Sequence, residues 1–301
     1  MGAVKIEHIS KSFGEQTALN DINLDIPAGT LFGLIGPDGA GKSTLFRILT
    51  SLLIPDSGKA TVAGLDTVAD YKQIRRIIGY MPGKFSLYQD LTVEENLNFF
   101  ATIFGTTIEE NYHLIKEIYV QIEPFRKRRA GKLSGGMKQK LALCCALIHE
   151  PEVLFLDEPT TGVDAVSRAE FWDMLQRLKA HGITIIVSTP YMDEASRCEQ
   201  IALIQEGQIL QVDTPDNIRE SYEQPLYAVK AKSFYQLLKD LRAAPFTKRV
   251  APFGEYLHLT TSGYSPEEAI YNLLKEKQHE EIEVKRINAT IEDVFLELAA
   301  G

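Results

Sequence analysis

GPDGAGKS occupies residues 36–43 and fits the pattern G-x-x-x-x-G-K-[ST] of a phosphate-binding loop. The apolar run at 31–35 before it predicts a buried strand, and residues 44–53 after it predict a helix that ends before Pro55 and Gly58. Glycines let backbone N–H groups face a phosphate, and the following helix points its positive end at the same anion. Strand, loop and helix together predict a nucleotide-binding α/β core.

A second apolar run, Val153–Leu156, ends in the adjacent carboxylates Asp157 and Glu158. In a phosphoryl-transfer site, one such carboxylate holds magnesium and another orients or activates the attacking water. The alternative is a carboxylate pair that only closes a strand. The phosphate-binding loop upstream favours the catalytic interpretation.

The segment Leu133–Met137, with the sequence LSGGM, lies between these two elements. We call it the signature segment. It opens a predicted helix over 138–148, so Ser134 and the two glycines present backbone donors at a helix N-terminus. A second phosphate contact is therefore expected there.

In this order the three elements resemble the ATP-binding subunits of ABC transporters, over roughly residues 4–220. The resemblance is closest to exporter ATPases of the drug-efflux type, and it includes TTGVD at 160–164 and NATIEDVF at 288–295. It implies an ATPase that uses ATP and magnesium. It also implies a dimer in which the signature segment of one chain contacts the γ-phosphate held by the other. No residue identifies the transported molecule.

The resemblance also assigns the site residue by residue. Glu158 is the expected catalytic residue, Ser43 and Asp157 are the expected magnesium ligands, and Asp164 belongs to a loop that communicates across the dimer. The expected ATP-binding residues are Phe13, Ala18, Gly36, Pro37, Asp38, Gly39, Ala40, Gly41, Lys42, Ser43 and Thr44. The expected contacts with the partner's ATP are Leu133, Ser134, Gly135, Gly136 and Met137. Taken alone, an aromatic such as Phe13 is more often a core residue.

Two positions depart from the family pattern. Gly83 replaces a Gln that touches magnesium and the attacking water, and Pro190 replaces a His that contacts the γ-phosphate. Neither glycine nor proline supplies such a polar group. Because losing one positioned group at a phosphoryl-transfer site costs about 100-fold in rate, the chain is expected to bind MgATP and hydrolyse it slowly. Asp38 is a smaller departure from Asn, and its charge near the phosphates would weaken nucleotide binding.

These departures favour a heterodimer, in which the signature segment completes a competent site on a second ATP-binding subunit or tandem half. An active homodimer that depends on Glu158 is the alternative. The other expected partner is an integral membrane transporter subunit. The expected location is cytoplasmic, on the inner face of the cell membrane, because no apolar run is long enough to span a bilayer and Met1–Ile6 lacks a signal-peptide pattern.

Composition argues against a nucleic-acid partner. The net charge is −9 and the pI is about 5.3, whereas phosphate backbones require clustered cations. The run RKRR at 126–129 is interpreted as a solvated patch, and Cys144 and Cys145 as buried packing residues of an apolar helix. A soluble ABC-type ATPase acting on DNA or ribosomes remains an alternative, but it usually carries a coiled-coil insertion or basic arm. A P-loop kinase would lack the signature segment.

The pattern along the chain predicts two domains, an ATP-binding domain at 1–222 and a small α+β domain at 223–301. Alternation over residues 4–26 predicts an antiparallel β layer, and the later strands predict a parallel sheet with crossover helices. Helical periodicity marks an inserted subdomain at about 88–150. In the C-terminal domain the expected strands are 226–231, 256–260 and 281–286, and the expected helices are 234–243 and 266–275.

Overall fold

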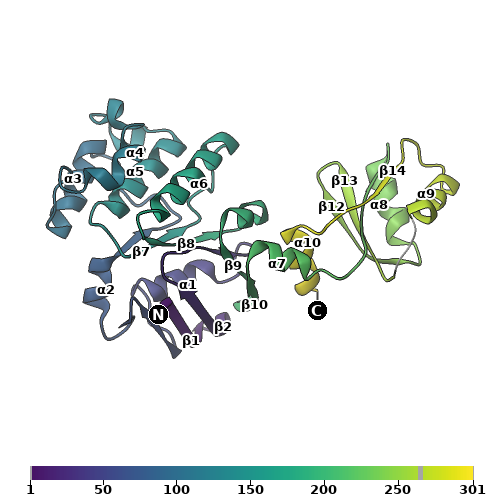
Figure 1. Cartoon of the computed structure of the whole chain (residues 1–301), viewed down its shortest axis with the longest axis horizontal. Coiled ribbons are helices and arrows are strands. Elements are labelled where there is room, and N and C mark those ends of the chain that lie inside the picture. The colour runs from purple at the N-terminus through teal and green to yellow at the C-terminus, as the bar shows by residue number, and fades with distance from the viewer. Residues whose placement is uncertain (1, 264–266, 301) are drawn as a thin grey trace. The chain divides into compact units, whose positions relative to one another are not determined.

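The predicted strand, loop and helix lie at the centre of the N-terminal part of the chain (Figure 1). β3 (Leu31–Ile35) is buried along its length, and α1 (Lys42–Leu49) begins directly after the loop. β3 belongs to a six-stranded sheet of order β10-β9-β3-β8-β7-β6, in which all strands except β10 run parallel. The other members are β6 (Ile78–Met81), β7 (Val153–Asp157), β8 (Thr184–Thr189), β9 (Gln200–Gln205) and β10 (Gln208–Asp213). Continuous apolar runs suit strands that are covered on both faces.

A second, antiparallel sheet packs over α1, as the alternation over 4–26 predicts. Its order is β2-β1-β4-β5. Its strands are β1 (Gly2–Phe13), β2 (Gln16–Pro27), β4 (Ser57–Val62) and β5 (Leu65–Asp66). Residues of both sheets and of α1 form one apolar core, in which the rings of Phe46 and Phe155 meet edge to face at 5.6 Å. The burial of α1 between two sheets fixes the direction in which the helix points its N-terminus.

Helices dominate between β6 and β7, where the sequence predicts an inserted subdomain. They are α3 (Val93–Phe104), α4 (Tyr112–Tyr119) and α5 (Gly135–Leu147). α3 begins with a capping box between Thr92 and Glu95 and ends at Gly105, whose φ is 73°. Cys144 and Cys145 are buried in α5, as expected, and burial raises the pKa of both thiols. Two further α-helices of the first unit lie outside this insertion: α2 (Tyr71–Ile77) precedes β6, and α6 (Ala165–Lys179) follows β7.

The computed structural model describes residues 2–263 and 267–300, and the chain divides into two units, Met1–Pro215 and Asp216–Gly301. The division falls at the start of α7 (Pro215–Glu220), before the expected boundary at residue 222. The segment after Pro215 belongs with the second unit, because the Tyr222 hydroxyl bonds Thr260 Oγ1 at 2.7 Å there. Met1 and Pro266, the latter the first residue of an expected C-terminal helix, lie outside the described residues.

The second unit has the order β-α-β-β-α-β of a ferredoxin-like domain, followed by one more helix. Its antiparallel sheet runs β12-β13-β11-β14. The elements are β11 (Leu226–Lys230), α8 (Phe234–Arg242), β12 (Thr247–Phe253), β13 (Tyr256–Thr261), α9 (Glu267–Glu276), β14 (Glu283–Arg286) and α10 (Ile291–Leu298). Sequence patterning missed β12, an edge strand of which only Val250 is buried. It also missed α10, which starts at a capping box formed by Thr290 and Asp293.

Within the described residues, no helix has both the length and the apolar character needed to cross a membrane.

The side chain of Asn96 on α3 holds the loop at 88–92 in place through hydrogen bonds. Its side chain is buried, accepts a hydrogen bond from Tyr88 N–H and donates to the Tyr88 and Thr92 carbonyls at 3.0 and 2.9 Å. Replacing Asn96 by Ala leaves these backbone groups unpaired, so the free energy of unfolding should fall by about 2 kcal/mol. Urea unfolding followed by circular dichroism measures this. Asn98→Ala, on the exposed face of the same helix, is the control and should leave the midpoint unchanged.

Candidate functional site

The loop at 36–43 is held in shape by close backbone approaches. Gly41, which caps α1, has a φ of 105°, and a β-carbon there would lie 2.6 Å from the Ala18 carbonyl oxygen. A β-carbon on Gly36 would lie 2.1 Å from the Ile204 carbonyl oxygen. Only glycine fits these two positions without displacing the backbone. The loop is therefore a tight cradle at the N-terminus of α1, which suits an anion.

Lys42 is the cation of this cradle. Its side chain is 3% exposed, and Nζ donates to the Gly36 and Pro37 carbonyls at 2.8 and 2.9 Å. The same Nζ lies 3.3 Å from Oε1 of Glu158. The Lys42 ammonium is buried, and its partners are two loop carbonyls and one carboxylate. Phosphate oxygens would form stronger, charge-assisted hydrogen bonds with it, so the side chain is placed to bind a phosphate. The residues of the loop thus fit a nucleotide phosphate.

The expected carboxylates lie where β7 meets β8. Asp157 is buried, and its Oδ1 accepts a 2.6 Å hydrogen bond from the Ser188 hydroxyl. Glu158 follows with a φ of 50°, a left-handed conformation that is uncommon for a non-glycine residue. Its N–H donates to both Oγ and O of Ser188 at 3.0 Å. Ser188 was not a sequence candidate, although the pairing of parallel strand ends would have pointed to it.

The two departures from the family pattern lie at the same edge. A β-carbon added to Gly83 would stand 3.1 Å from the Asp157 carbonyl oxygen and 3.9 Å from its carboxyl carbon. Pro190 follows Thr189, whose carbonyl accepts a 3.2 Å hydrogen bond from Gly36 N–H. Gly83 thus borders Asp157, Pro190 directly follows a residue that is bonded to the phosphate-binding loop, and neither position contributes a polar side-chain atom.

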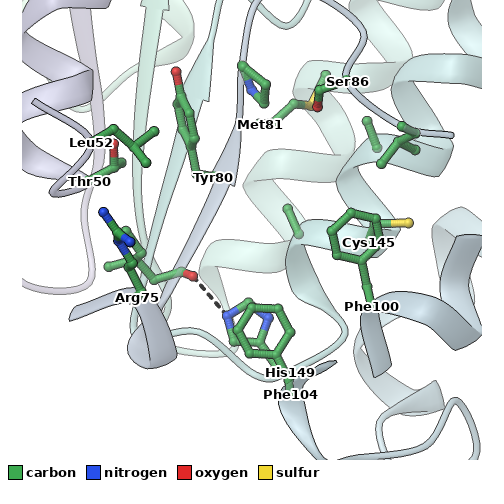
Figure 2. Close-up of a pocket in the computed structure, with 15 residues that line it drawn as sticks. Thr50, Leu52, Arg75, Tyr80, Met81, Ser86, Phe100, Phe104, Cys145 and His149 are labelled. Atoms are coloured by element: carbon green, nitrogen blue, oxygen red, sulfur yellow. Dashed lines mark hydrogen bonds between the residues drawn. The ribbon is translucent and has the colours of Figure 1, made fainter. Parts of the chain in front are cut away.

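Neither His149 nor His181 takes the place of Pro190. His149 lies at the amino end of β6, where Nε2 is 2.8 Å from the Ile78 carbonyl oxygen and the ring stacks on Phe104 at 3.7 Å (Figure 2). It lines a cavity of about 190 Å³ between β6 and the helical segment, and burial lowers its pKa. His181 precedes the amino end of β8. Both lie at the opposite ends of their strands from Gly83 and Pro190.

Phe13 is not a core residue, because 51% of it is exposed at the end of β1. The Lys11 ammonium lies 5.7 Å from the centre of its ring. Ala18, on the neighbouring strand β2, reaches the phosphate-binding loop through its carbonyl, the oxygen closest to the added β-carbon of Gly41. Phe13 is therefore an exposed aromatic residue on the strand that pairs with the strand of Ala18.

The signature segment lies against the expected dimer loop of the same chain. Ser134 caps α5 by accepting a 3.4 Å hydrogen bond from Met137 N–H. A β-carbon on Gly136 would stand 3.3 Å from Oγ of Ser167, which in turn donates to Asp164 at 2.8 Å. Hydrogen bonds from Ser167 hold the pKa of Asp164 below its usual value. In the described parts of the chain, no hydrogen bond joins the signature segment to the phosphate-binding loop.

Glu194 is a buried carboxylate that sequence reasoning did not select, and it connects the end of β8 with the segment before Asp164. Glu194 is 3% exposed and accepts hydrogen bonds from the hydroxyls of Thr189 at 2.6 Å and Thr160 at 3.1 Å. Arg168 on α6 lies 3.7 Å from its other oxygen. Glu194 therefore ties the segment after β8 to the segment that leads to Asp164.

The comparisons with known proteins agree with this geometry. The family model described as ABC transporter matches residues 19–161. The Nod factor export ATP-binding protein I of Rhizobium sp. (strain N33) is 35% identical over 300 residues, covering 98% of this chain and 96% of that protein. The daunorubicin resistance ATP-binding protein DrrA2 of Streptomyces coeruleorubidus is 39% identical over 221 residues, covering 72% and 68%.

A further relative, the probable multidrug ABC transporter ATP-binding protein YbhF of Escherichia coli (strain K12), is 46% identical over 209 residues. The match covers 69% of this chain and 36% of YbhF, so the chain spans about a third of that protein.

Two solved structures extend the likeness to the fold. The protein cbiO1 of Clostridium perfringens, part of the ABC transporter complex cbiONQ, superposes with a TM-score of 0.65 at 27% identity, over 73% of this chain and 91% of that one. A dimeric ATP-binding cassette in a post-hydrolysis state with ADP and Pi bound gives a TM-score of 0.63 at 27% identity, over 70% and 98%. This chain belongs to the ATP-binding proteins of ABC transporters, a family of ABC-type ATPases.

Proposed function

We propose that this chain is the ATP-binding subunit of an exporter, that it binds MgATP on its own phosphate-binding loop, and that it hydrolyses this ATP slowly. Export is suggested by the names of its relatives, which concern multidrug transport, Nod factor export and daunorubicin resistance. One observation carries the slow turnover: Gly83 and Pro190 border Asp157 and the loop without a polar side-chain atom.

Binding follows from groups that are already in place. Lys42 would exchange the Gly36 and Pro37 carbonyls for phosphate oxygens, and the N-terminus of α1 would add its backbone donors. Magnesium, when bound, would neutralise phosphate charge, and Ser43 and Asp157 would hold it. Glu158 would orient a water and accept its proton, as its side chain lies beside Lys42 at the mouth of the loop. A water oriented by Glu158 alone is poorly fixed, because two of its usual neighbours are missing.

The signature segment gives the chain a second role. It lies beside Asp164 and has no hydrogen bond to its own phosphate-binding loop in the described residues, so its Ser134 is free to contact a nucleotide on another chain. We favour a heterodimer, in which this segment completes a site whose Gln and His belong to a second ATP-binding subunit or tandem half. An active homodimer driven by Glu158 is the competing arrangement.

The proposed setting is the inner face of the cell membrane, next to an integral membrane subunit. An ABC-type ATPase that does not engage in transport is the alternative. The relatives that match the chain over almost its full length are named for export, which favours the transporter.

Removal of the Lys42 charge tests the binding site. Lys42→Met keeps the apolar stem and removes the ammonium, so the affinity for MgATP should fall about 100-fold or more. Isothermal titration calorimetry measures the Kd. Lys59→Met, on an exposed position of β4, is the matched control and should bind MgATP as the unmodified chain does. Equal affinity of Lys42→Met and the unmodified chain would exclude this loop as the ATP site.

Restoring the family residues tests slow turnover. Pro190→His together with Gly83→Gln should raise the ATPase rate of the purified chain by about 100-fold or more. Because a β-carbon at position 83 lies 3.1 Å from the Asp157 carbonyl oxygen, the backbone there must shift slightly, and Gly83→Ala controls for that crowding. Rates are compared at concentrations where chromatography shows a dimer. Brisk turnover by the unmodified chain would contradict the proposal.

Co-purification tests the partners. A tagged chain extracted from the membranes of its own host in mild detergent should bring down an integral membrane protein and a second ATP-binding polypeptide. Ser134→Arg should weaken retention of the ATP-binding polypeptide in the presence of ATP, because it blocks the shared nucleotide, while the membrane protein stays. Recovery of nucleic acid with strong salt dependence would instead favour the non-transport alternative.

A further inference from the structure

We infer that Ser188 is a positioning residue for magnesium-dependent nucleotide binding: its hydroxyl orients the Asp157 carboxylate and fixes the backbone turn that carries Glu158. The inference rests on the proposed function, since it concerns the same ATP site. Ser188 is fully buried near the carboxyl end of β8, directly opposite Asp157 in the strand register.

The hydroxyl of Ser188 has one proton to donate and can accept others, and both capacities are used. Its proton goes to Oδ1 of Asp157 at 2.6 Å, a length typical of a hydroxyl bound to a charged carboxylate. Its oxygen accepts from Glu158 N–H at 3.0 Å. One side chain therefore joins the two carboxylate residues through different atoms.

Asp157 depends on this contact. Among the residues that the structure describes, no other side chain donates a hydrogen bond to its carboxylate. Asp157 is only 4% exposed, so water has little access to replace a lost partner. With Oδ1 engaged by Ser188, Oδ2 remains for a ligand, and the rotation of the carboxyl group is restricted. Gly83, where an added β-carbon would lie 3.9 Å from the Asp157 carboxyl carbon, has no side chain to share this task.

Glu158 depends on Ser188 as well. Its φ of 50° is costly for a residue with a β-carbon and persists only where the surroundings enforce it. The N–H of Glu158 is held at once by the hydroxyl and the carbonyl of Ser188, and the Thr161 N–H donates to the Glu158 carbonyl at 3.2 Å. Loss of the hydroxyl removes one of the two acceptors that hold the Glu158 N–H.

A positioning role and a purely structural role predict different measurements. If Ser188 only stabilises the fold, its removal lowers the melting temperature and affects ATP with or without magnesium equally. If it orients Asp157, its removal weakens the magnesium-dependent part of binding, because Asp157 would hold the metal whereas the loop and Lys42 would hold the phosphates.

The experiment measures the Kd of ATP by calorimetry, once in excess magnesium and once in EDTA, together with the melting temperature. Ser188→Ala should weaken MgATP binding about 10-fold and leave binding in EDTA unchanged, since a hydrogen bond to a charged group is lost. Ser188→Thr, which keeps the hydroxyl, should recover most of the loss. Ser188→Cys, similar in size but a weak donor, should behave like Ser188→Ala and covers the case in which the alanine variant does not fold.

The matched control is Thr184→Val, at the amino end of the same strand, where the buried hydroxyl oxygen accepts from Gly29 N–H at 3.0 Å. It should lower the melting temperature without changing the ratio of the two Kd values. A Ser188→Ala ratio equal to that of the unmodified chain would overturn this inference and leave the proposed function standing. An unmodified chain whose ATP affinity does not respond to magnesium would overturn both.

Discussion

The parallel pairing of β3 with β8, and of β8 with β7, is the constraint on which the rest of the site depends. It brings the ends of three strands from distant parts of the chain to one edge, so Gly36 N–H reaches the Thr189 carbonyl and Ser188 faces Asp157. In a parallel sheet the loops that follow the strands all leave at the same edge, where polar residues and helix N-termini lie close together. The burial of α1 between two sheets then aims its N-terminus at that edge.

The sequence motifs of the candidate site lie at the ends of regular elements. The loop at 36–43, the carboxylates at the end of β7 and the cap at Ser134 are each encoded in a short run of residues, and the structure places each at the start or end of a helix or strand. The parallel strands of the six-stranded sheet and the inserted helices also follow from continuous apolar runs and from helical periodicity. Such signals need no knowledge of tertiary contacts.

The parts that sequence reasoning missed depend on contacts between distant segments. Ser188 and Glu194 carry no motif, and their roles follow from partners 31 and 34 residues away at Asp157 and Thr160. The edge strand β12 has one buried residue and therefore lacks the alternation that marks a half-buried strand. The units divide at Pro215 and not at residue 222 for the same reason. The Tyr222 hydroxyl bonds Thr260, which follows it by 38 residues.

The close approach of Gly83 to the end of β7 limits which side chains position 83 accepts. Backbone atoms partly occupy the space that a side chain at position 83 would need, since an added β-carbon would stand 3.1 Å from the Asp157 carbonyl oxygen. Any residue larger than glycine there requires the end of β7 to give way by a few tenths of an ångström, and Asp157 is the last residue of that strand. A substitution at position 83 therefore acts on the Asp157 carboxylate through the backbone as well as through the new side chain.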